Sequence, residues 1–176
     1  MAPLFVLLGA FVISLPAIKY FTKVYDYSLS GRIAMSVMLL FTAIGHFTFT
    51  EGMVSMMPGF IPFKKELVYI TGVIEICAAI GLIFFRLQHV TAWLLILFFL
   101  LVLPANINAA VKNIDYQTGN NTGHGVAYLW FRVPLQIFFI AWTYFFGIRL
   151  KTKTKIKTST ENQASLNKSM LQKGDE

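Results

Sequence analysis

The stretch "MSVMLLFTAIGHFTFTEGM", residues 35–53, changes character halfway along. Its first part is almost wholly apolar and is typical of the middle of a membrane-spanning helix. The second part carries His46 and Glu51. An ionisable side chain near or within lipid loses its hydration unless a partner compensates for it. His46 is therefore the first indication of a polar site inside an apolar bundle.

The composition predicts a polytopic helical membrane protein. Of the 176 residues, 56% are hydrophobic and 13% are charged, against roughly 25% charged residues in ordinary globular proteins. Much of the net charge of +7 comes from lysines that follow the last apolar segment. This placement favours an anchor against anionic lipid over a nucleic-acid site. The single cysteine, Cys77, excludes an intramolecular disulfide, and we predict that it is a buried apolar filler.

Five apolar segments predict five spans and an all-α fold. They cover residues 4–18, 32–50, 67–85, 89–111 and 126–148. The first is the weakest, because it is short and Pro16 interrupts it, and a removable signal peptide is the alternative. We predict a retained span, since no basic residue precedes it. The predicted organisation is an N-terminal transmembrane segment and basic loop (1–31), a four-helix membrane bundle (32–148) and a basic, disordered cytoplasmic tail (149–176).

The distribution of Lys and Arg predicts the orientation. If all five segments span and the tail is cytoplasmic, the inner connections hold eleven of the fifteen basic residues and the outer ones hold three. The remaining one, Arg132, lies within a span. This asymmetry follows the positive-inside rule, so the N-terminus faces outward and the C-terminus is cytoplasmic.

Costly polar side chains from four segments reach a common depth. With a helical rise of about 1.5 Å per residue, His46, Glu75 and Arg132 lie roughly 6–12 Å below the outer ends of their segments. Asn106 joins them from the fourth segment, just after Pro104, whereas the inner half carries almost nothing comparable. We predict a polar pocket in the outer half, with Glu75 and Arg132 paired at its centre because pairing reduces the cost of charge in hydrocarbon.

Further residues complete this predicted site. Tyr128 and Gln136 recur at four-residue spacing with Arg132 and are placed in the pocket. The entrance is assigned to Glu51, Pro58 and Pro62, with Glu51 pairing with Lys64 or Lys65. The alternative is that the Glu75–Arg132 pair only fixes helix register and binds no ligand. The few histidines and the lone cysteine do not suggest a metal site.

Three stretches resemble the DoxX family of small bacterial and archaeal membrane proteins. They are "GHFTFTEGMVSMMPGFIPFKKELVYITGVIEICAAIGLI", "LPANINAA" and "FRVPLQ", and the resemblance covers about residues 32–148. The residues that match the family pattern are His46, Pro58, Pro62, Gly72, Glu75, Pro104, Asn106 and Arg132. The resemblance implies a four-helix bundle that serves as a membrane subunit or partner of a redox system, and it assigns no catalytic role to these residues. The first segment is an addition to that pattern.

The sequence therefore predicts a multi-pass protein of the bacterial inner membrane whose pocket accepts a quinone headgroup, with no tightly bound cofactor. Its predicted partners are the lipid bilayer and either a redox protein or further copies of the chain. Whether the chain is itself an enzyme stays open. The alternative function is a non-catalytic assembly or chaperone protein that binds partner helices through the small-residue stripe Gly72, Glu75 and Ala79. A transporter is disfavoured because no polar path continues to the inner side.

Overall fold

A computed structural model describes residues 2–112 and 125–150, except for the side chains of residues 125–128. The described residues form only helices and the turns between them. In chain order these are α1 (Ala2–Thr22), α2 (Tyr27–Thr48), α3 (Thr50–Met56), α4 (Lys64–Ile83), α5 (Gln88–Val111), α6 (Gly125–Thr143) and the π-helix η1 (Tyr144–Arg149). Five of these helical stretches are long and apolar enough to cross a membrane, with α6 and η1 together making the fifth.

The predicted segments are all helical, and the all-α prediction is confirmed. Most of the helices extend a few residues beyond the predicted ranges, because polar residues at the ends continue the backbone hydrogen bonding. The largest single shift is at the start of α2, which begins at Tyr27 instead of residue 32, and α1 continues from Ala2 to Thr22 through Pro16. A proline removes one helical hydrogen bond but does not always end a helix. The basic tail that begins after Leu150 lies outside the described residues.

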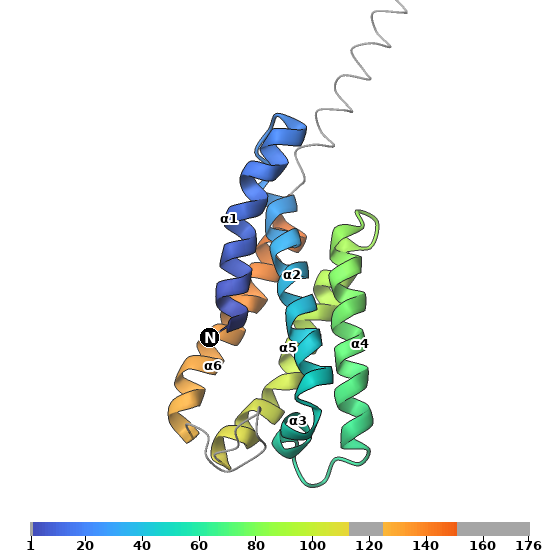
Figure 1. Cartoon of the computed structure of the whole chain (residues 1–176), viewed down its shortest axis with the longest axis vertical. Helices are drawn as coiled ribbons and strands as arrows, with labels where there is room; N and C mark the ends of the chain where they lie inside the picture. Colours follow the sequence, from blue (N-terminus) through green and yellow to red (C-terminus); the bar gives the residue numbers. More distant parts are fainter. Residues whose placement is uncertain (1, 113–124, 151–176) are drawn as a thin grey trace, which may run out of the picture.

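Helix α2 is the element around which the others pack (Figure 1). It contacts α1, α4 and η1, and its residues Ala34, Met35, Met38 and Leu39 are almost completely buried. Helices α5 and α6 pack on each other, and α4 packs on both α2 and α5. Because α2 contacts most of the other helices, polar side chains near either of its ends can meet side chains from several helices.

Between α2 and α4 the chain bends twice and forms the short helix α3. After α3 the segment 57–63 is not helical, which confirms that Pro58 and Pro62 prevent a continuous helix here. Phe63 ends this segment in the left-handed region with φ of 52°. The segment and α3 lie at the same end of the molecule as the last turn of α2 (Figure 1).

The outward faces of the long helices are apolar. Large exposed side chains include Ile74, Ile80, Leu94 and Leu101. Such continuous apolar surfaces are expected where helices contact lipid. Cys77 lies on this exposed face, so the prediction that it fills the interior is wrong. Helix α4 turns Glu75 and Ala79 inward, and two positions after Glu75 a helix presents a different face.

Candidate functional site

The centre of the candidate site is a contact between α2 and α4. Nε2 of His46 lies 3.6 Å from Oε1 of Glu75, and the two side chains are 16% and 8% exposed. The helices approach closely here because α4 has a glycine opposite the histidine. A Cβ atom on Gly72 would lie 3.0 Å from the Cβ of His46. The carboxylate of Glu75 on α4 therefore reaches a partly buried imidazole on the neighbouring helix.

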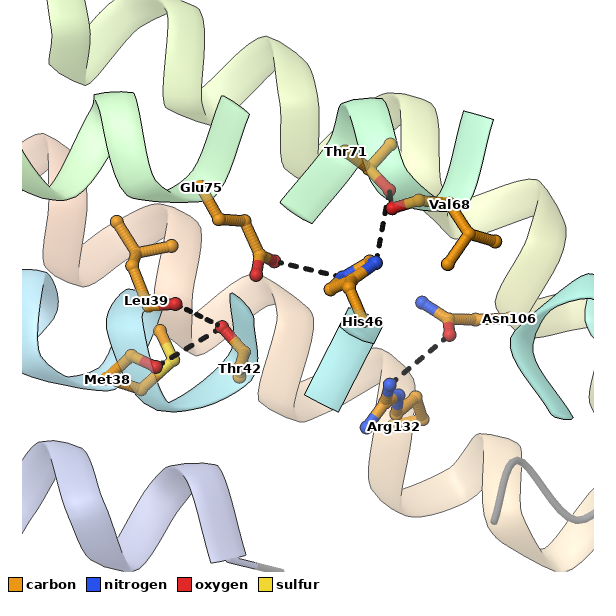
Figure 2. A network of polar contacts seen from close by, with 9 residues as sticks. All are labelled: Met38, Leu39, Thr42, His46, Val68, Thr71, Glu75, Asn106 and Arg132. Carbon is orange, nitrogen blue, oxygen red and sulfur yellow. Dashed lines mark hydrogen bonds and ion pairs between the residues drawn. The ribbon is translucent and has the colours of Figure 1, made fainter. Parts of the chain in front are cut away.

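Thr71, one helical turn before Glu75, holds the other nitrogen of the same ring. Its Oγ1 lies 3.1 Å from Nδ1 of His46 and donates a hydrogen bond of 2.8 Å to the carbonyl of Val68 (Figure 2). The imidazole thus has a polar neighbour on each of its two nitrogens. Thr71 was not among the predicted site residues, although its four-residue spacing from Glu75 places it on the same face of α4.

A second pair completes the layer from α5 and α6. Nη2 of Arg132 donates to Oδ1 of Asn106 at 3.4 Å, and Asn106 is only 2% exposed (Figure 2). The sequence predicts Glu75 and Arg132 as the central pair. In the structure the charged end of Glu75 lies against His46, while Arg132 bonds to Asn106. We call His46, Thr71, Glu75, Asn106 and Arg132 the His46 layer.

One carboxylate oxygen in this layer has no hydrogen-bond partner. Oε2 of Glu75 is buried, and nothing in the described part of the chain donates to it. A buried acceptor left without a donor costs about 1–3 kcal/mol. Such atoms in otherwise satisfied structures require an explanation, and a bound molecule or water is one. Within the described residues no three His, Cys, Asp or Glu side chains come together to hold a metal ion.

The remaining residues predicted for the pocket have other positions. Gln136 is buried, but its amide donates to the carbonyl of Phe99 on α5. Phe99 precedes Leu100, whose carbonyl loses its helical donor because Pro104 has no N–H. The amide group of Gln136 is therefore bound to the backbone of α5 near the proline and is not directed at the His46 layer. The side chain of Tyr128 lies outside the described residues.

The predicted entrance residues lie at the α3 end of the molecule. Glu51 pairs with Lys65 at 3.1 Å, which confirms one of the two predicted partners, and both side chains are largely exposed. Pro58 is half-buried and Pro62 is exposed. Asn108 faces away from Asn106 and donates to the carbonyl of Met56 at 2.6 Å, so it joins α5 to α3. The two asparagines thus serve different contacts, as their two-residue spacing requires.

A second polar cluster lies at the opposite end of α2, and the prediction that this half carries almost nothing comparable is wrong. Arg32 is 3% exposed, and it donates to the carbonyls of Leu82 and Ser28 and to the side chain of Gln88. Asp26, 1% exposed, begins α2 by accepting from the backbone of Leu29 at 3.0 Å. We call Asp26, Ser28, Arg32 and Gln88 the Arg32 cluster.

This cluster was missed because Arg32 stands at the edge of its apolar segment and was counted as a loop cation. The sequence does contain a signal for it. An aspartate followed by small polar residues, "DYSLSGR", is typical of the start of a helix, and that start places Arg32 inside the helix. The carbonyl of Leu82 belongs to the last turn of α4, where a cation is favourable. Arg32 thus stabilises the end of α4.

The small-residue stripe of α4 is buried within the chain itself. Gly72 packs against His46, and the carbonyl of Ala79 accepts a 2.8 Å hydrogen bond from Ser36 of α2. Small residues allow such close approach of two helices. Because α2 already covers this stripe, it offers no surface to a partner helix, and the assembly alternative loses the feature on which it was based.

Five long apolar helices with polar groups turned inward are the features of a multi-pass helical membrane protein. The chain belongs to the family described as "Domain of unknown function (DUF8561)", whose model matches residues 35–147. No curated protein and no solved structure matches the chain. The matched range begins after Arg32 and includes every residue of the His46 layer.

Proposed function

We propose that the chain is a DoxX-like subunit or partner of a quinone-linked redox system in the inner membrane, and that the His46 layer binds the quinone headgroup. A quinone headgroup carries carbonyls that accept hydrogen bonds, and its reduced form carries hydroxyls that donate them. The layer contains a donor pair, Arg132 and Asn106, and an acceptor, the buried Oε2 of Glu75. Donors and an acceptor in one layer could serve both the carbonyls and the hydroxyls of such a ring.

The observation that carries this proposal is the buried Oε2 of Glu75 without a donor. Glu75 itself is 6% exposed, and its other oxygen already contacts His46. A ligand hydroxyl at Oε2 would supply the missing hydrogen bond, and one to a charged group contributes about 1.5–3 kcal/mol. A carboxylate beside an imidazole is also suited to exchanging protons with such a ligand.

The proposed orientation places this layer in the outer half of the membrane. The α3 end of the molecule has Lys64 and Lys65, whereas the opposite end has Lys19, Lys23 and Arg86 and leads into the lysine-rich tail. The positive-inside rule then supports a cytoplasmic tail and an outward N-terminus. A hydrophobic ligand that is dissolved in the bilayer would reach the site from within the membrane.

Binding of a ubiquinone or menaquinone analogue to the purified chain in lipid nanodiscs tests the proposal. Glu75→Gln should weaken binding by about tenfold or more, because it changes the acceptor that faces the ligand. The matched control is Glu66→Gln, which makes the same change at an exposed position in the first turn of α4. Equal affinity of wild type, Glu75→Gln and Glu66→Gln, or no binding to wild type, would contradict the proposal.

The affinity of the Arg132→Leu variant for quinone is a second test of the same site. Loss of the guanidinium removes a donor that lies within hydrogen-bonding distance of Asn106, so the oxidised quinone should lose more affinity than the reduced form. Glu75→Gln should instead reduce the affinity for the reduced form more than the affinity for the oxidised form. If each variant reduces the affinity for the oxidised and the reduced quinone by the same factor, the substitutions have caused a general loss of structure.

A further inference from the structure

The contacts of Thr71 determine which nitrogen of His46 carries a hydrogen. A threonine hydroxyl has one hydrogen to donate, and a backbone carbonyl can only accept. The hydroxyl of Thr71 donates to Val68 at 2.8 Å and lies 3.1 Å from Nδ1 of His46. When that hydrogen is given to Val68, the hydroxyl can only accept from the histidine, and Nδ1 is then the donor. The hydrogen bond at one ring nitrogen defines the state of the other.

In a neutral His46 of this form, Nε2 carries a lone pair. That lone pair faces Oε1 of Glu75 at 3.6 Å. A lone pair and an ionised carboxylate repel each other, so the contact is favourable only when a proton resides on one of the two atoms. The separation exceeds that of an ordinary hydrogen bond by about 0.5 Å, a gap that a small rotation of the glutamate side chain closes.

We infer that Thr71 is a positioning residue, which holds His46 with a hydrogen on Nδ1, so that the His46–Glu75 pair retains one proton between Nε2 and Oε1. This inference deepens the proposed function, because it defines the ligand class as one that presents a hydroxyl to Oε2 of Glu75. A donor at Oε2 stabilises the carboxylate and moves the retained proton to Nε2. Among the described residues, Arg132 of α6 bonds to Asn106 in the same layer, while Glu51 of α3 is exposed and bound to Lys65.

Nitrogen-15 NMR of histidine-labelled protein in lipid bilayers tests the inference without any ligand, because the two ring nitrogens have separate chemical shifts. The signals of His46 are assigned by their loss in His46→Gln, since the chain also contains His89 and His124. Wild type should show Nδ1 carrying hydrogen at neutral pH. Thr71→Val removes the acceptor at nearly constant volume, and His46 should then shift toward the form with hydrogen on Nε2. Thr71→Ser should retain the wild-type pattern.

A wild-type His46 with hydrogen on Nε2 alone would overturn the inference, as would an unchanged pattern in Thr71→Val. Infrared spectroscopy adds a readout on the carboxyl group. With the retained proton on Glu75, a protonated carboxyl band should be present in wild type and absent in Glu75→Gln. With the proton on His46, both ring nitrogens should carry hydrogen. If neither is observed, no proton is retained and the inference fails.

These results are separable from the proposed function. The NMR and infrared measurements use the chain alone, so they report on Thr71 whether or not a quinone binds. Adding a quinol analogue then tests both ideas together: the proton should move from Glu75 to Nε2 of His46, or remain on Nε2 if it is already there. Binding with the carboxyl group left protonated would contradict the inference and leave the quinone proposal standing.

Discussion

Polar side chains are buried at both ends of α2, but their partners differ between the two ends. In the Arg32 cluster, the buried guanidinium bonds to two backbone carbonyls and one amide side chain. In the His46 layer, polar side chains meet mainly one another, and one buried carboxylate oxygen has no donor. Backbone carbonyls are held in place by their helices and cannot be exchanged for a ligand. The first end therefore holds helices together through fixed backbone groups, whereas the second is the end that we propose as the ligand site.

The largest expected effect is at the Arg32 cluster. Arg32→Leu removes the hydrogen bonds to Ser28, Leu82 and Gln88 and the positive charge that interacts with the buried Asp26. The free energy of unfolding should therefore fall by about 3–5 kcal/mol. Unfolding in mixed detergent micelles, followed by circular dichroism, measures this. Arg86→Leu is the matched control, because Arg86 is exposed near the same end and should change stability by less than about 0.5 kcal/mol. Similar losses in the two variants would remove the distinction.

Glycine substitutions compare how tightly the helices pack at each end. A Cβ on Gly31 would overlap the ring of Phe146, which is itself held against Trp142 at 4.6 Å. Gly31→Ala should therefore cost about 1–3 kcal/mol. Gly72→Ala meets the Cβ of His46 at 3.0 Å and needs a shift of only a few tenths of an ångström, so its cost should be smaller.

Gly9→Ala is the control for these two variants, since nothing lies within 4 Å of its added Cβ. It should leave stability unchanged or raise it slightly, because alanine favours helix. The same unfolding assay ranks the three substitutions. A larger loss for Gly72→Ala than for Gly31→Ala would show that the His46 end is the more rigid one, and would contradict the comparison.

The smallest expected effect on stability is that of Glu75→Gln. Glutamine keeps the shape of the side chain and can still bond to His46, so the free energy of unfolding should change by less than about 1 kcal/mol. The unfolding assay used for Arg32→Leu measures it. A loss as large as that of Arg32→Leu would show that the His46–Glu75 contact mainly stabilises the fold. The sequence left such a structural role open for Glu75, there paired with Arg132.

Much of the fold followed from local properties of the chain. The five apolar segments were located correctly because hydropathy over about 20 residues is decided within each segment. The separation of Asn106 from Asn108 and the interruption at Pro58 and Pro62 also follow from local geometry. The prediction of a common depth for His46, Glu75, Asn106 and Arg132 used only the rise per residue and the order of the spans.

The partners within that layer depended on the tertiary structure. Depth along a helix does not determine the direction in which a side chain points around its axis, and so the sequence paired Glu75 with Arg132 while the structure pairs it with His46. The same reason explains why Cys77 was placed inside and Arg32 in a loop. The rotation of each helix is determined by how small residues such as Gly72 and Gly31 meet their neighbours, and that packing exists only once all the helices are together.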